Sequence, residues 1–187
     1  INSTFNNNFS VIGGGAILAS GTLTITDSTF TNNSTSGGGG AITAIGATTI
    51  SNSIFDTNST VYPGGAIVAS DTLTITDSTF NNNSAGGGGA VYGEQALTIS
   101  NSTFTSNSAG NGGALYALGT LTLTNSTFVN NSSVWGGCAI YTESNLTLTH
   151  NTFLNNHSPD TLNLYSTANA TLTHNIISGS GTLCTND

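Results

Sequence analysis

Residues Asp71–Asn83 read DTLTITDSTFNNN, and nearly the same stretch returns along the whole chain. Its alternation of threonine with leucine or isoleucine has the period of two that is typical of a β-strand with one apolar face. The phenylalanine, and the asparagine three positions after it, recur every 24 or 25 residues. A period this strict indicates that each repeat is one structural unit stacked on the next.

A second recurrent stretch lies between successive phenylalanines: Gly-Gly-Ala followed by an aliphatic residue, as in Gly64–Ile67. It predicts a third strand in each repeat, entered through a tight corner at the glycines, which tolerate positive φ. No helical apolar period is present to cover separate sheets. We therefore predict an all-β fold, a right-handed single-stranded parallel β-helix (β-solenoid) of about 7–8 coils of 24–25 residues with three parallel sheets. We expect residues 1–187 to form a single β-helix repeat domain, a segment of a longer array or polymer.

Identical residues lie on top of one another in such a coil. The phenylalanines should stack ring upon ring and fill the core, and the asparagines, which we expect to end their strand, should hydrogen-bond from coil to coil. The members of this predicted structural ladder are Phe30, Phe55, Phe80, Phe104, Phe128, Phe153, Asn33, Asn58, Asn83, Asn107, Asn131 and Asn156.

The charge balance excludes several classes of partner. The chain has no Lys or Arg and eight acidic residues, which gives a net charge of −8. Without a fixed cation it cannot neutralise phosphates, so we expect no nucleic-acid partner. No apolar run is long enough for a transmembrane helix, so we expect no direct membrane insertion. The absence of trypsin-type cleavage sites suits an exposed extracellular protein.

Two cysteines, Cys138 and Cys184, leave the redox compartment open. A bond between them would favour an oxidising compartment. The repeat places them about two coils apart, roughly 9–10 Å at ~4.8 Å per coil, whereas a disulfide requires Cα atoms about 4.4–6.8 Å apart. A bond would therefore require the C-terminal segment to fold back.

The two patterns, Gly-Gly-Ala followed by Ile, Leu or Val, and Phe-x-x-Asn, resemble the repeats of the polymorphic membrane protein family of bacterial autotransporter adhesins. The first pattern stands at Gly14–Ile17, Gly39–Ile42, Gly64–Ile67, Gly88–Val91 and Gly112–Leu115. In the next repeat Cys138 replaces the second glycine. More broadly, the chain looks like a pectin-lyase-like right-handed β-helix surface protein. This resemblance implies a surface-exposed repeat and names no receptor.

Enzymes share this fold, so a catalytic role for this chain is one alternative. Lyases of this class are expected to use Arg or Lys, which are absent here. Asp27 and Asp77 share one column two coils apart, roughly 10 Å, on the order of an inverting carboxylate pair. Asn52 stands between them, and we interpret the column as a turn position at which Asp and Asn are interchangeable. His150 and His174 continue it, as a two-histidine metal site or, in our interpretation, as solvent-facing turn residues. We predict no catalytic, metal or cofactor site and no enzyme activity.

Two outward columns are candidate binding surfaces. Stacked tyrosines on the C-terminal half could hold a glycan or a neighbouring chain, or form a cross-strand packing ladder without a ligand. This column contains Tyr92, Tyr116, Tyr141 and Tyr165. An unbroken threonine column resembles the ice-binding faces of antifreeze β-solenoids. Alternatively, threonine stands there simply because it is a favourable outward residue in an exposed sheet. The members of this column are Thr24, Thr49, Thr74, Thr98, Thr122, Thr147 and Thr171.

These features lead us to expect a structural or adhesive module of an extracellular or cell-surface protein, sheath or fibre. Its expected partners are further repeats or a second copy stacked end to end, and a glycan or a host or neighbour surface. Acceptor sequences such as Asn58-Ser59-Thr60 would carry glycans if the source glycosylates asparagine. One alternative is an ice-binding protein that uses the threonine column, and a second is a β-helix that binds or degrades polysaccharide.

Overall fold

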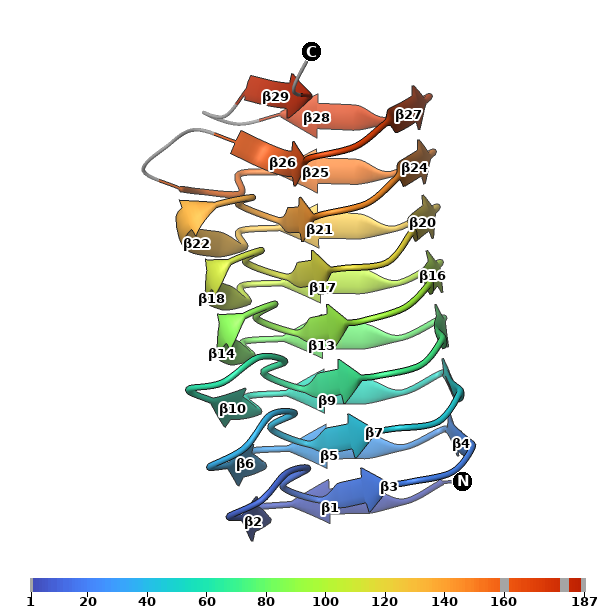
Figure 1. Ribbon diagram of the computed structural model, residues 1–187, viewed down its shortest axis with the longest axis vertical. Helices are drawn as coiled ribbons and strands as arrows, with labels where there is room; N and C mark the ends of the chain where they lie inside the picture. The colour runs from blue at the N-terminus through green and yellow to red at the C-terminus, as the bar shows by residue number, and fades with distance from the viewer. Residues whose placement is uncertain (1, 159–161, 179–181, 186–187) are drawn as a thin grey trace.

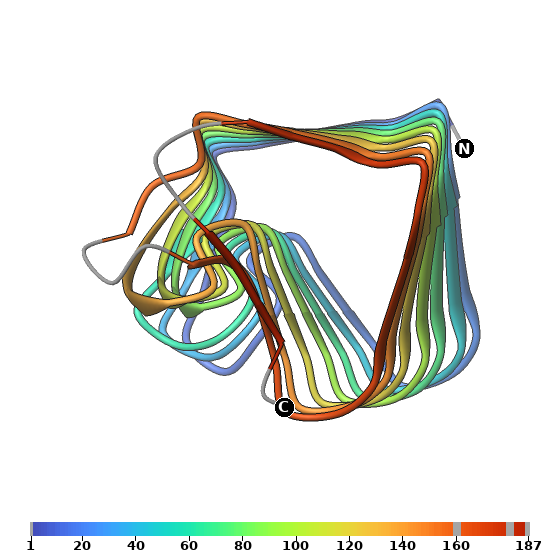
Figure 2. The same ribbon diagram turned by 90° about the horizontal axis from the view of Figure 1, so that it is seen from above.

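The computed structural model describes residues 2–158, 162–178 and 182–185, and in these residues the chain forms strands and turns without a helix. The chain winds into a solenoid whose coils lie one above the other (Figure 1). Viewed along its axis, the solenoid has a four-sided outline with a protruding lobe at one corner (Figure 2). All strand pairs are parallel and join neighbouring coils, which confirms the predicted all-β parallel solenoid.

The phenylalanine strands form an eight-stranded sheet, here called the Phe sheet. Its strands are β1 (Thr4–Asn6), β5 (Thr29–Thr31), β9 (Ile54–Asp56), β13 (Thr79–Asn81), β17 (Thr103–Thr105), β21 (Thr127–Val129), β25 (Thr152–Leu154) and β28 (Ile176–Ser178). The central residue of each strand points inward and its two neighbours point outward, as the alternation of side chains in a strand requires. Phe80 therefore pairs with Phe55 on one side and with Phe104 on the other.

The alternating Thr-Leu/Ile stretches form a seven-stranded sheet, here called the Thr sheet. Its strands are β4 (Leu23–Thr26), β8 (Thr48–Ser51), β12 (Leu73–Thr76), β16 (Leu97–Ser100), β20 (Leu121–Thr124), β24 (Leu146–Thr149) and β27 (Ala170–Thr173). In β12, Leu73 and Ile75 are buried, whereas Thr74 and Thr76 lie on the outer face. The period of two in the sequence thus gives the face of each residue correctly.

The strands that follow the glycines form an eight-stranded sheet, here called the Tyr sheet. Its strands are β3 (Ile17–Ala19), β7 (Ile42–Ala44), β11 (Ile67–Ala69), β15 (Val91–Gly93), β19 (Leu115–Ala117), β23 (Ile140–Thr142), β26 (Leu162–Ser166) and β29 (Thr182–Thr185). The aliphatic residue that ends each Gly-Gly-Ala motif faces the core, and the next residue faces outward.

A fourth sheet, here called the short sheet, corrects the prediction of three sheets and has six strands. Its strands are β2 (Phe9–Ser10), β6 (Ser34–Thr35), β10 (Ser59–Thr60), β14 (Ser84–Gly87), β18 (Ser108–Asn111) and β22 (Ser132–Gly136). The ladder asparagine was expected to end the strand before it, but that strand already ends two residues earlier, as β5 does at Thr31 before Asn33. The chain extends again directly after the asparagine. Ser34 and Thr35 pair with Ser59 and Thr60, so each coil gains one more short parallel ladder.

The corners of the coil depend on residues in the left-handed region. Asp27 (φ 51°) turns the chain from the Thr sheet to the Phe sheet, Asn32 (φ 53°) turns it into the short sheet, and Gly39 (φ 73°) precedes the Tyr sheet. The same three positions recur through most of the described coils. Asn, Asp and Gly adopt this conformation at the lowest cost, which explains why they punctuate the repeat.

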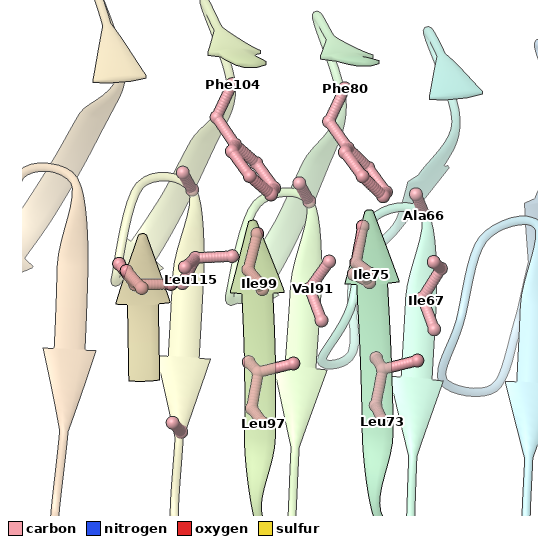
Figure 3. Packing of buried hydrophobic residues seen from close by; sticks show 14 of the residues in the cluster. Ala66, Ile67, Leu73, Ile75, Phe80, Val91, Leu97, Ile99, Phe104 and Leu115 are labelled. Atoms are coloured by element: carbon pink, nitrogen blue, oxygen red, sulfur yellow. The ribbon is translucent and has the colours of Figure 1, made fainter. Parts of the chain in front are cut away.

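The core is one continuous apolar column inside the coils. Figure 3 shows how Phe80 and Phe104 stand above Ile75 and Ile99 of the Thr sheet and Ile67 and Val91 of the Tyr sheet. The six phenylalanines from Phe30 to Phe153 are completely buried. This column fixes the orientation of every outward position, because a strand that slipped by one residue would bury its threonines.

Candidate functional site

The asparagine ladder is the most regular polar feature of the molecule. The side-chain oxygen of Asn58 accepts from the backbone nitrogen of Asn33 at 3.0 Å and from its Nδ2 at 2.9 Å. Nδ2 of Asn58 donates to the carbonyl oxygen of Phe30 at 3.0 Å. The same bonds recur from Asn8 to Asn156, and Asn33 to Asn156 are at most 1% exposed. The ladder predicted from the sequence is confirmed, with a hydrogen-bond partner for each amide.

The phenylalanine ladder runs beside it. Successive rings from Phe5 to Phe153 have centroids 4.6–5.0 Å apart. Phe80, for example, lies 4.7 Å from both Phe55 and Phe104, with interplanar angles of 3°. The rings are therefore parallel and repeat at the spacing of the strands. Both faces of an interior ring are covered, so these residues are structural and offer no surface to a ligand.

A second polar ladder escaped the sequence analysis. The backbone nitrogen of Ser53 donates to Oγ of Ser78 at 3.1 Å, and Oγ of Ser53 donates to the carbonyl of Ser51 at 2.7 Å. The ladder runs through a serine column and continues in Asn151 and Asn175. There the side-chain oxygen of each asparagine accepts from the backbone nitrogen at the same position of the preceding coil. The signal of this ladder in the sequence is the unbroken serine two residues before each phenylalanine from Ser3 to Ser126.

The threonine column lies on the outer face of the Thr sheet, as predicted. Thr74 pairs with Thr49 and Thr98 in register, and the neighbouring Thr76 pairs with Ser51 and Ser100. The central threonines are exposed, except for Thr74, which is half-buried. The result is a regular grid of hydroxyl and methyl groups spaced by the coils. Its proposed ice-binding role stays a prediction.

The tyrosine column lies on the outer face of the Tyr sheet. Ring centroids are 5.2 Å apart between Tyr92 and Tyr116, 4.6 Å between Tyr116 and Tyr141, and 4.5 Å between Tyr141 and Tyr165. All four are half-buried, and the Tyr116 hydroxyl donates to the carboxylate of Glu143. The sequence analysis thus brought together four side chains that do contact one another. Their role in binding a partner stays a prediction.

The geometry of the coil agrees with a comparison to protein families. A family model for the right-handed beta helix region matches residues 1–128. The chain belongs to this right-handed β-helix family. The match supports the predicted handedness, while the finer resemblance to polymorphic membrane protein repeats stays a prediction. No curated protein and no solved structure matches the chain.

The acidic and histidine column of the β-helix occupies one corner throughout. Asp27, Asp77, His150 and His174 all have φ between 49° and 57°, so the column is a series of left-handed turn residues. Nδ2 of Asn52 donates to the Asp27 carboxylate, which ties Asp27 to the next coil. The two imidazole rings stack with centroids 5.0 Å apart. In the described residues this corner gathers no third metal-ligating side chain and no pocket.

Cys138 is a free, buried thiol, and burial raises its pKa to about 11. Strand pairing places Cys184 in line with Tyr165, three positions beyond Cys138 in register and in a later coil. The two cysteines are therefore separated both along the strand and across coils. The side chain of Cys184 lies outside the described residues. The alternative of a bond to Cys138 thus receives no support from the backbone register.

Apolar residues at the tips of the lobe were not anticipated. The lobe consists of the ends of the short strands and the segments that follow them, and it carries Ile12, Val61 and Trp135, which are 78%, 81% and 66% exposed. The Trp135 ring lies over Gly110 of the preceding coil, where an added Cβ would come within 2.6 Å of it. In the sequence, these exposed residues are marked by a pair of adjacent apolar residues that stands at the same position in three repeats. No helix long and apolar enough to cross a membrane was found in the described part of the β-helix.

Proposed function

We propose that this β-helix is a structural and adhesive module of an extracellular or cell-surface protein, sheath or fibre. One observation carries the proposal: the recurrent Phe, Asn and Ser positions of the repeat bond one coil to the next. A molecule held together in this way is a rod whose length scales with coil number, as in other solenoids. The outward columns then offer a regular surface to a partner, and we propose no catalytic role for them.

Electron microscopy of the purified chain tests the rod, and retention of chain-coated beads on a cell or glycan surface tests adhesion. We expect straight rods of uniform width that lengthen end to end as the concentration rises, because exposed strand edges pair readily. Beads coated with the β-helix should be retained more strongly than beads coated with an unrelated protein of similar charge. Compact particles that stay single at high concentration, together with unretained beads, would contradict the proposal.

Ice binding is a second candidate, supported by the in-register threonine grid of the Thr sheet. A bulky side chain within the grid should abolish thermal hysteresis, whereas the same side chain on another face should not. Thr74→Tyr in the Thr sheet and Asn81→Tyr in the Phe sheet form a matched pair, because both positions are half-buried and lie in the same coil. Absence of thermal hysteresis in the unmodified chain would remove this candidate.

A further inference from the structure

The tyrosine stripe, defined as Tyr92, Tyr116, Tyr141 and Tyr165, presents edges and hydroxyl groups, not ring faces. The rings are stacked at 4.5–5.2 Å, so each interior face is covered by the next ring. Sugars and quaternary ammonium groups are recognised chiefly over open aromatic faces. The stacking therefore disfavours these ligands and leaves a row of phenolic hydroxyls as the accessible part of the stripe.

Two carboxylates border this row. Glu94 and Glu143 follow Tyr92 and Tyr141 by two residues, at the corner where the Tyr sheet ends, and both are exposed. The carboxylate of Glu143 accepts a hydrogen bond from the Tyr116 hydroxyl. Burial, and then the nearby carboxylates of Glu94 and Glu143, raise the pKa of Tyr92. The carboxylates thus impose a negative potential along the hydroxyl row.

No permanently cationic side chain of the protein neutralises this potential, because the sequence has no Lys or Arg. The opposite edge of the stripe meets the lobe, where Gly87 lies close to the Tyr116 ring and adds no charge. A second copy of the chain would bring a net charge of −8 and no Lys or Arg. Charge complementarity therefore points to a cationic partner of a different sequence.

We propose that the tyrosine stripe with Glu94 and Glu143 binds an extended basic segment, rich in arginine, of another protein. This ligand class rests on the adhesive function proposed above. A guanidinium group matches the site because its planar set of donors can bond carboxylate and phenolic oxygens together. The three steps from Tyr92 to Tyr165 span about 14 Å at ~4.8 Å per coil, the length of roughly four extended residues.

Binding of a hexa-arginine peptide, measured by calorimetry at low and moderate salt, tests the proposal. The charge-removing pair Glu94→Gln/Glu143→Gln should weaken binding about fivefold or more, the sum of two exposed ion pairs. Asp27→Asn/Asp77→Asn is the matched control, because it removes the same charge from an exposed corner outside the stripe. We expect the control to change the affinity by less than about twofold. Circular dichroism should show unchanged folding in both variants.

Two further arms test the chemistry of the site. Hexa-citrulline, which keeps the shape of hexa-arginine but has no charge, should not bind. Tyr116→Phe keeps the stack and removes one hydroxyl, so it should weaken binding about two- to threefold. The proposal is overturned if hexa-arginine does not bind at low salt, if hexa-citrulline binds equally well, if Tyr116→Phe has no effect, or if the two charge variants weaken binding equally. A failure here with straight rods and retained beads would reject this ligand and leave the adhesive module in place.

Discussion

The side-chain oxygen of Asn83 accepts two hydrogen bonds from Asn58, one from the backbone nitrogen and one from Nδ2, both at 3.0 Å. Nδ2 of Asn83 also donates to the carbonyl of Phe55. One buried amide thus serves backbone and side-chain groups of the preceding coil. The stability of the β-helix should therefore depend on single asparagines in its interior.

Asn83→Ala should lower the free energy of unfolding by about 2–4 kcal/mol, because two buried donors of Asn58 lose their acceptor. Urea denaturation followed by circular dichroism measures the change. Asn81→Ala, at an outward position of β13 in the same coil, should change stability by about 0.5 kcal/mol or less. Equal effects of the two substitutions would mean that the asparagine ladder does not stabilise the fold.

Phe80→Ala should cost about 3–5 kcal/mol, since it removes a completely buried ring that stacks on both sides. Phe5→Ala removes a half-buried ring that, within the described residues, stacks only on Phe30, so it should cost less. Thermal unfolding of both variants gives the comparison. The prediction fails if Phe5→Ala is as destabilising as Phe80→Ala.

Gly89→Ala should be strongly destabilising, because its Cβ would lie 2.1 Å from the carbonyl oxygen of Gly113 in the next coil. Two backbone atoms of Ser108, also in the next coil, would lie 2.7 Å away. Backbone atoms cannot rotate aside, so the two coils would have to move apart. At Gly93 the added Cβ meets its nearest atoms at 3.6 Å, an ordinary contact. Gly93→Ala should therefore be neutral or stabilise by about 0.4–1 kcal/mol. Denaturation midpoints of Gly89→Ala and Gly93→Ala, each of which adds one methyl group, measure the two effects. Equal midpoints would contradict the prediction.

Cys138 should make stability fall as the pH rises from about 9 to about 11. Burial holds the thiol protonated in the folded chain, with a pKa of about 11, whereas an unfolded thiol ionises near its ordinary pKa of 9.0. The unfolded state therefore binds fewer protons in this range, and its relative free energy drops as the pH rises. Cys138→Ala should show a smaller fall. The raised pKa values of Tyr92, Tyr116 and Tyr141 act in the same direction in both proteins.

Thiol labelling provides an independent check on Cys138. In a Cys184→Ser background, a buried, protonated thiol should react with a disulfide reagent only as fast as the chain opens. Addition of urea should raise the labelling rate steeply. Fast labelling under native conditions would show that this part of the β-helix is open to solvent.

A substitution at Asp77 tests the alternative that the β-helix degrades polysaccharide. We expect no turnover of acidic polysaccharides by the unmodified chain, because Asp77 lies in a column of turn residues with positive φ. Reducing-end assays on a panel of acidic polysaccharides measure this. Turnover that disappears in Asp77→Asn would establish a catalytic carboxylate and contradict our proposal.

The sequence was sufficient for the features that repeat in the core. The positions of Phe80, Asn83 and Leu73, and their parallel stacking, follow from a fixed period and a simple alternation of faces. Turn positions such as Asp27 could likewise be recognised, because only a few residue types tolerate the left-handed region.

The fourth sheet and the lobe could not be predicted in the same way. Two residues, such as Ser34 and Thr35, are too few to show an alternation, and their pairing depends on the coils above and below. The serine ladder was missed for a different reason. A small hydroxyl beside a turn, such as Ser53, is common in any loop, and its coil-to-coil bond is visible only in three dimensions.

Each ladder asparagine turns its side-chain oxygen toward the coil that precedes it. The upper and lower sides of a coil are therefore chemically different, as the two ends of an arrow are. A stack of such coils has a polarity that every added coil must respect, since a coil laid on in reverse would set oxygen against oxygen. Any fibre that grows from this β-helix should thus run in one direction, with a distinct leading and trailing end.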